Sequence, residues 1–112
     1  MKGNYLGELE ELILLTVGAL FESAYGVAIM DEIERQTNRR LNISAVHSVL
    51  KRLEAKGFVK SEMGGATNER GGRRKRLFKL TSSGKKVLDA SMQVRSHLYN
   101  QIPNMSFNFS GQ

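Results

Sequence analysis

The residues with the most distinctive chemistry form a basic cluster in the second half of the chain. Arginine or lysine occupies every position from 73 to 76, and Arg70 and the pair Gly71-Gly72 come just before them. Guanidinium groups bind phosphate through charge-assisted hydrogen bonds, and glycines let a backbone approach phosphate closely. We interpret the cluster as a phosphate-binding loop. The alternative, charges that only keep an edge strand from aggregating, fits Lys79 but leaves the glycines unexplained.

Two other patterns resemble catalytic or metal-binding chemistry. Ser48 and Lys51 have the Ser-x-x-Lys spacing of penicillin-binding enzymes, but the companion Ser-Asp-Asn and Lys-Thr-Gly motifs are missing. His47 and His97 are the only histidines, and nothing places a second ligand at helical spacing beside both. The sequence therefore predicts no catalytic residues, no metal site and no cofactor.

Charge is unevenly distributed along this chain of 112 residues, whose formal net charge is +6. Residues 1–34 carry seven acids and one base, whereas residues 35–86 carry fifteen bases and three acids. Crowded like charges destabilise a fold, which indicates a polyanionic partner, with nucleic acid ahead of an anionic membrane. A merely solvated basic surface is the alternative.

The composition indicates one small domain that folds without disulfides, because the chain is short and contains no Cys. The longest apolar run, from Leu12 to Leu15, is far too short to cross a membrane, and no signal peptide is evident. We therefore expect a cytoplasmic protein without a membrane partner.

Hydrophobic periodicity predicts three helices in the first half of the chain. The first spans about residues 6–21 and is apolar on more than one side, and the second contains apolar positions from Val27 to Ile33. After the β-compatible residues 41–43, we expect a third helix with Ser44 as N-cap and Gly57 as stop signal. Its inward residues are Val46, Val49, Leu50 and Leu53.

With those four positions buried, the third helix must present small, polar and basic side chains outward, which suits base edges in a DNA groove. The candidate base-contacting residues are Ser44, Ala45, His47, Ser48, Lys51 and Arg52. His47 is either a donor to a base or phosphate or a solvated surface residue.

A β-hairpin and a fourth helix are predicted next. Strands at residues 58–63 and 73–80 flank a Gly-rich loop, and Thr81 or Ser82 caps a helix that continues to about Leu98. Leu77 and Phe78 point to opposite faces of the second strand, so one of them must cover the core. Three helices followed by a basic hairpin is the order of a winged helix-turn-helix, an α+β fold that is mainly α.

The chain resembles the PadR-like transcriptional regulators, a family of bacterial winged-helix proteins. The resemblance extends from residue 6 to about residue 98. It is carried by the segments LGELEELILL (6–15), AYG (24–26), VLKRLEAKG (49–57) and ERGGRRKR (69–76), followed by Leu80-Thr81 and Gly84. It implies a homodimer that joins through the C-terminal helix with help from the first helix, binds a palindromic operator and represses transcription.

These inferences define the expected regions and contacts. We expect a winged helix-turn-helix domain over residues 1–80, a dimerisation helix over 81–102 and a disordered tail over 103–112. The expected wing contacts to DNA are Arg70, Gly71, Gly72, Arg73, Arg74, Lys75 and Arg76. The expected dimer contacts are Leu6, Leu14, Val87, Leu88, Met92 and Leu98.

Two departures from the family limit what the resemblance implies. His47-Ser48 stands where many members have Tyr-Pro, so the operator sequence cannot be taken from relatives. Only one helix follows the wing, and the chain has no Trp to stack on a flat ligand, so no effector is identified. Two alternatives stay open: a winged-helix protein-interaction module and a MarR-like regulator.

Overall fold

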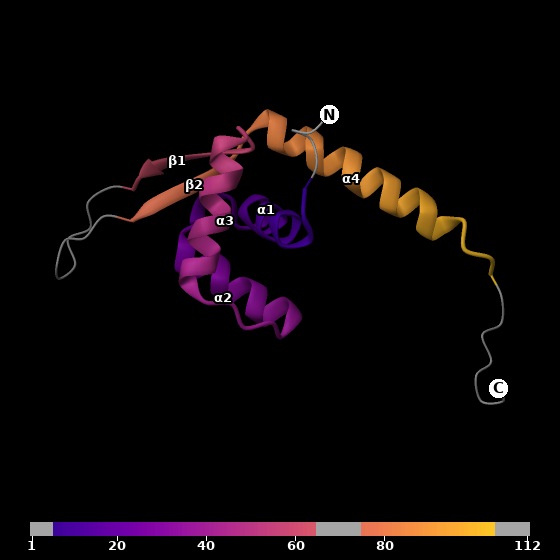
Figure 1. Cartoon of the computed structure of the whole chain (residues 1–112), viewed down its shortest axis with the longest axis horizontal. Coiled ribbons are helices and arrows are strands. Elements are labelled where there is room, and N and C mark those ends of the chain that lie inside the picture. The colour runs from indigo at the N-terminus through magenta and orange to yellow at the C-terminus, as the bar shows by residue number, and fades with distance from the viewer. Residues whose placement is uncertain (1–5, 65–74, 105–112) are drawn as a thin grey trace.

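The computed structural model describes residues 6–64 and 75–104. Within these ranges the elements are α1 (Glu8–Leu20), the 3₁₀ turn η2 (Phe21–Ser23), α2 (Gly26–Thr37), α3 (Ile43–Ala55), β1 (Val59–Met63), β2 (Arg76–Leu80) and α4 (Ser82–Asn100). Figure 1 shows α1, α2 and α3 packed together, with the hairpin extending from one side of them and α4 from the other. This order confirms the predicted winged helix-turn-helix fold.

Apolar side chains from α1, α2, α3, the hairpin and the start of α4 meet in one core. The four inward residues predicted for α3 are all buried. Phe78 is buried, whereas Leu77 is only half-buried, so Phe78 is the residue of β2 that covers the core. The predicted pattern of inward positions is therefore confirmed for α3 and β2.

The ends of α3 and α4 show which side chains direct the backbone. The Asn42 side-chain oxygen accepts a hydrogen bond from the Ala45 N–H at 2.8 Å, so Asn42 and not Ser44 is the N-cap of α3. Residues 41 and 42 thus lead into a helix and form no strand. Gly57, with φ +82°, ends α3 as predicted. Thr81 caps α4, because its Oγ1 accepts a hydrogen bond from Gly84 N–H at 3.0 Å.

The hairpin is joined to the helices by a short extended segment that the sequence analysis did not predict. β1 and β2 are antiparallel, with Ser61 opposite Phe78. The Phe78 N–H donates to the Ala24 carbonyl at 3.0 Å, and Tyr25 forms a β-bridge with Leu77. Residues 24 and 25 therefore fix the hairpin to the start of α2.

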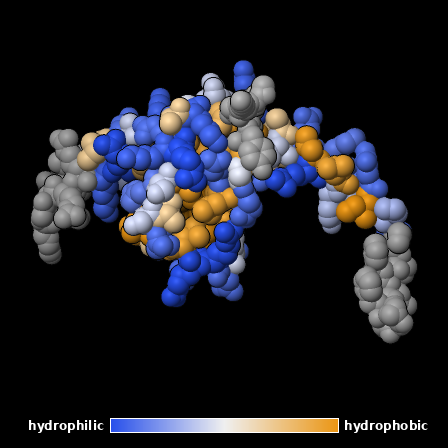
Figure 2. All heavy atoms as spheres, in the orientation of Figure 1, coloured by the Kyte–Doolittle hydropathy of each residue, from blue (hydrophilic) through white to orange (hydrophobic). Residues whose placement is uncertain are grey.

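The first half of α4 packs against the core, and its second half projects away from it (Figure 1). Gly84 and Leu88 are buried, whereas Val94 and Leu98 are each 59% exposed. Figure 2 shows hydrophobic residues along this projecting part of the molecule. Among the described residues, no helix combines the length and apolar character needed to cross a lipid bilayer.

Candidate nucleic-acid interface

One exposed stripe of side chains runs along the outward face of α3. Ser44, His47, Ser48 and Lys51 are exposed and follow the i, i+3, i+4, i+7 spacing of a helix face, and Ala45 beside them is half-buried. The stripe is exposed because the apolar residues of α3 are buried on the opposite side. It offers hydroxyl, imidazole and ammonium groups, all of which can form hydrogen bonds with base edges or phosphates.

The imidazole of His47 lies against the first residue of α2. A Cβ atom on Gly26 would lie 2.8 Å from His47 Cε1 and 3.1 Å from Nε2, so the ring occupies the space that a larger residue would need. Gly26 is buried, whereas His47 taken as a whole is exposed to solvent. The α2 backbone therefore limits the positions that the His47 ring can adopt.

Arg52 has a partner inside the fold that the sequence analysis missed. Its Nε donates to Glu10 Oε2 on α1 at 3.3 Å, although 56% of its side chain remains exposed. Lys56, one turn further along the chain, contacts the same carboxylate at 3.0 Å. A contact between Arg52 and DNA stays a prediction, and this arginine also attaches the end of α3 to α1.

Lys75 and Arg76 are the two wing candidates within the described residues; Arg70, Gly71, Gly72, Arg73 and Arg74 lie outside them. The Lys75 carbonyl accepts a hydrogen bond from Gly64 N–H at 2.6 Å, and its Nζ lies 5.8 Å from the centre of the Tyr25 ring. This contact lies within the range of a cation–π interaction. Tyr25 therefore supports the hairpin beside Lys75, near the C-terminal end of the basic cluster.

Arg76 is held within the hairpin. Its guanidinium donates to Ser61 Oγ at 3.0 Å, and that hydroxyl donates to Glu54 Oε2 on α3 at 2.9 Å. Arg76 and Ser61 therefore connect the hairpin to α3. Its contact with DNA remains a prediction.

Lys60 is a further candidate that the sequence analysis did not select. It lies directly opposite Lys79 in the hairpin, on the face away from the buried Phe78. Lys79 Nζ lies 3.6 Å from a Glu62 carboxylate oxygen, and Lys60 is exposed. Facing like charges destabilise a hairpin, so an anion beside Lys60 would relieve this repulsion. The strand alternation in the sequence was the signal that could have identified it.

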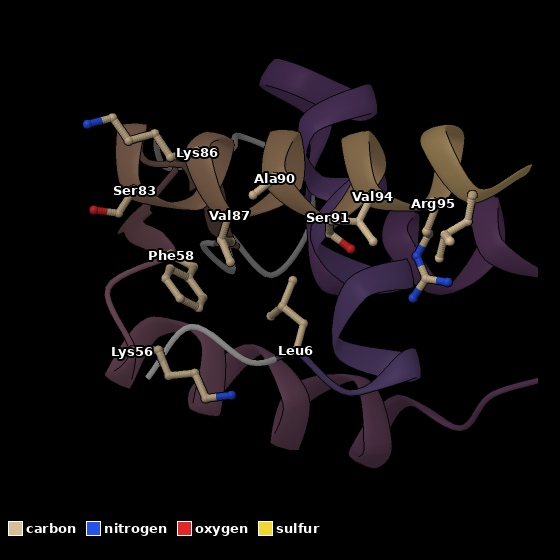
Figure 3. Close-up of a pocket in the computed structure, with 11 residues that line it drawn as sticks. Leu6, Lys56, Phe58, Ser83, Lys86, Val87, Ala90, Ser91, Val94 and Arg95 are labelled. Carbon is tan, nitrogen blue, oxygen red and sulfur yellow. The ribbon is translucent and has the colours of Figure 1, made fainter. Parts of the chain in front are cut away.

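A groove of about 940 Å³ runs along α4, between this helix and two other parts of the chain, one containing Leu6 before α1 and one containing Phe58 before β1 (Figure 3). Three of its apolar residues, Val87, Val94 and Leu98, follow one another at the seven- and four-residue spacing of a helix seam. Figure 3 shows Leu6 and Val87 directed into the space between the helices. This groove contains Leu6, Val87 and Leu98 of the expected dimer contacts, together with Val94, which the prediction omitted.

Two of the expected dimer contacts need correction. Leu14 is 0% exposed and Leu88 is 5% exposed, because both pack into the core of the single chain. Neither presents a surface to a second subunit. Met92 is half-buried. Leu14 was selected because it lies outside the main apolar stripe of α1, and Leu88 because it lies among the apolar residues of α4; neither signal distinguishes core from interface.

Within residues 6–64 and 75–104, no group of three His, Asp or Glu side chains is placed to hold a metal ion. In the same ranges, every buried side-chain nitrogen or oxygen has a hydrogen-bond partner. In these ranges, the polar groups with open hydrogen-bonding capacity therefore lie on the surface.

The three-helix body, the exposed polar stripe on α3 and the attached hairpin define a winged helix-turn-helix protein. The model of the transcriptional regulator PadR-like family matches residues 13–90. The chain therefore belongs to the PadR-like family of transcriptional regulators. No curated protein matches it.

Solved structures agree with this assignment. A PadR family transcription regulator from Clostridium difficile R20291 is 28% identical, with a TM-score of 0.64 over 84% of this chain and 93% of that one. The protein smu.1704 from Streptococcus mutans UA159 is 29% identical, with a TM-score of 0.64 over 84% and 81%. Bacillus subtilis PadR in complex with operator DNA shares the fold, with 20% identity and a TM-score of 0.59 over 89% of this chain and 50% of that one.

Proposed function

We propose that this chain is a cytoplasmic, homodimeric, sequence-specific DNA-binding regulator that represses transcription from a palindromic operator. The observation that carries the proposal is the exposed stripe of Ser44, His47, Ser48 and Lys51 on α3, which lies beside a basic hairpin. A helix of this kind can enter the major groove and contact base edges. Bacillus subtilis PadR, which shares the fold, was solved in complex with operator DNA, and this supports DNA binding by the present chain.

The two binding elements have different roles in this proposal. The α3 stripe reads the sequence, because Ser48 and Lys51 can form hydrogen bonds with bases. The wing binds phosphates through the basic residues 70 and 73–76, with Lys75 held near Tyr25. Phosphate contacts supply affinity and register, whereas base contacts supply specificity.

The groove along α4 supports the homodimer. Val94 and Leu98 are exposed, and a second copy of the chain would remove these apolar side chains from water. A twofold axis between the subunits would present two α3 helices to two related half-sites. A palindromic operator follows from that symmetry.

The two alternatives have less support. A winged-helix interaction module would need no basic base-contacting face on α3, whereas Lys51 is exposed there. A MarR-like regulator would share the fold, but the family match is to PadR-like regulators.

Selection of bound sequences from a random DNA pool tests the proposal. We expect an inverted repeat whose half-sites lie about 10 base pairs apart, or a multiple of this. The variant Ser48→Ala/Lys51→Ala should not enrich the repeat. Failure of the folded wild-type chain to enrich any sequence would favour the interaction module, and a single asymmetric half-site would contradict the symmetric dimer.

A reporter placed behind the selected site should show lower expression when the protein is present, and higher expression would indicate an activator.

A further inference from the structure

Two adjacent carboxylates of α1 connect two different helices. Glu10 contacts Arg52 of α3 and Lys56, the C-cap residue of that helix, with distances of 3.3 Å to Arg52 Nε and 3.0 Å to Lys56 Nζ. Glu11 accepts a hydrogen bond from Ser91 Oγ, and its Oε1 lies 3.0 Å from Arg95 Nη2; both partners are on α4. Figure 1 shows α1 between α3 and α4.

Both carboxylates are buried, so each depends on its partners for hydrogen bonds more than an exposed carboxylate does. Glu10 is 7% exposed and Glu11 is 8% exposed. Burial raises the pKa of Glu10, but hydrogen bonds from the Gly7 backbone and the Lys56 side chain, the charge of Lys56 and a hydrogen bond from Arg52 together bring that pKa below its ordinary value. A buried charge that loses its partner is costly, so each carboxylate restrains the helix it contacts.

The contacts of Glu11 extend the attachment of α4 beyond the core. Leu88 is the last buried residue of α4, and Ser91 and Arg95 follow on the same face, one and two turns later. Figure 3 shows Arg95 directed from α4 toward the neighbouring helices. The exposed residues Val94 and Leu98 belong to this same part of α4. Glu11 therefore restrains the part of α4 that carries the proposed subunit contacts.

We propose that Glu10 and Glu11 are positioning residues that fix the direction of α4 relative to α3, and thereby set the half-site spacing that the dimer accepts. The inference rests on the proposed function, in which α4 joins two subunits and α3 reads each half-site. In that dimer, the hairpin connects the end of α3 to the start of α4, and a second route from each reading helix to the twofold axis passes from α3 through α1 to α4. Glu10 holds the first junction of this route, and Glu11 holds the second.

The dimensions of α4 make the spacing sensitive to this restraint. Its 19 residues span about 28 Å at a rise of about 1.5 Å per residue. A tilt of about 7° about its first turn would therefore move its other end by about 3.4 Å, which is about the rise of one base pair. A small loosening at Glu11 can therefore move the end of α4 by a distance comparable to one base-pair step.

The first test compares operators whose half-sites are moved apart by one base pair. We expect the wild-type dimer to bind the altered operator about tenfold more weakly, and Glu11→Gln to lose most of that penalty while it remains a dimer. Arg95→Ala should also reduce the spacing penalty, because it removes the exposed partner of Glu11 and leaves the other partner, Ser91, in place. Glu32→Gln is the matched control, since the ion pair of Glu32 with Arg35 stays within α2. Equal weakening on both operators, with an unchanged spacing penalty, would overturn the inference.

The second test needs no DNA. The chain has no Cys, so spin labels can be placed specifically at Ser44→Cys on α3 and Asn100→Cys on α4, both exposed positions. With labelled chains diluted in an excess of unlabelled chains, we expect Glu10→Gln and Glu11→Gln to broaden the distance distribution between the labels. Distributions as narrow as those of wild type and Glu32→Gln would overturn the positioning role. Failure of the wild type to bind DNA or to dimerise would instead overturn the proposed function, so the two failures are distinguishable.

Discussion

A Cβ atom on Gly26 would lie 2.8 Å from Cε1 of His47, so the imidazole ring rests against the first residue of α2. The ring is the end of an exposed side chain, and it can move aside more easily than backbone. Gly26→Ala should therefore displace His47 with little loss of stability. If His47 contacts DNA, the displacement should weaken operator binding.

A double-mutant cycle isolates this effect. We expect Gly26→Ala and His47→Ala each to weaken operator binding, by up to about 1–3 kcal/mol for one lost base contact. Gly26→Ala should have no further effect in the His47→Ala background, because the ring is already absent. Titrations of the four proteins against operator DNA measure the coupling. Additive losses would show that Gly26 acts independently of His47.

The wing and α3 should respond differently to mutation. Replacing Arg73 and Arg74 with Ala should weaken binding to operator and random DNA alike, and the salt dependence should become shallower by about 0.9 for each lost phosphate contact. Replacing Ser48 and Lys51 with Ala should instead cost about 1–3 kcal/mol per lost base contact at the operator and less on random DNA. Binding titrations over a range of salt concentrations measure both effects. A wing variant that lost only operator binding and kept its salt slope would show that the assigned roles are wrong.

Gly84 should contribute to stability, because a Cβ there would clash with the Phe58 carbonyl oxygen. We expect Gly84→Ala to lower the free energy of unfolding by about 1–3 kcal/mol, since backbone must shift to admit the methyl group. The matched control is Gly18→Ala, where the nearest atom is the flexible Leu80 Cδ2 at 3.3 Å. Alanine is a better helix former than glycine, so this variant should change stability by less than about 1 kcal/mol. Urea unfolding compares the two, and similar losses would contradict the prediction.

The sequence predicts the elements that hydrophobic periodicity and strong backbone signals specify. The inward residues of α3, the stop at Gly57 and the cap at Thr81 all depend on local chemistry, and the structure confirms them. Asn42 was missed because both Asn42 and Ser44 are good caps, and only the backbone shows which one is used.

Contacts between distant segments could not be derived in this way. The pairing of Tyr25 with Leu77 joins positions far apart in the chain, and neither has a motif that identifies the other. The same applies to Arg52, which periodicity placed outward, although its long side chain reaches Glu10 on α1. Leu14 was assigned to the interface because an apolar residue outside the main stripe can face either a partner or a second part of the core.

The lowered pKa of Glu10 predicts how stability depends on pH. Burial alone would raise this pKa, and the hydrogen bonds from Gly7, Lys56 and Arg52, with the charge of Lys56, more than offset it. Because the pKa is lower in the folded chain, this group stabilises the fold above the unfolded-state pKa of about 4.3, and its contribution is lost as the pH falls through the folded-state value.

Glu10→Gln should therefore be less stable than wild type at neutral pH, by about 1–3 kcal/mol. The difference should shrink as the pH falls below the ordinary range of a Glu carboxyl. Urea unfolding at a series of pH values measures both curves. A difference that stays constant into the acid range would show that the charge of Glu10 is not the source of its effect.

The exposed apolar residues of α4 should be required for dimerisation. Leu98 is 59% exposed on the projecting half of the helix, and in the proposed dimer it is covered by the second subunit. Leu98→Glu would place a charge in that contact, where desolvation of the carboxylate is costly. We expect light scattering at micromolar concentration to report twice the chain mass for wild type and the single chain mass for Leu98→Glu. Val27→Glu is the matched control, because Val27 is 57% exposed but lies on α2. That variant should remain dimeric. A monomeric wild type, or a dimer that survives Leu98→Glu, would contradict a subunit interface at this part of α4.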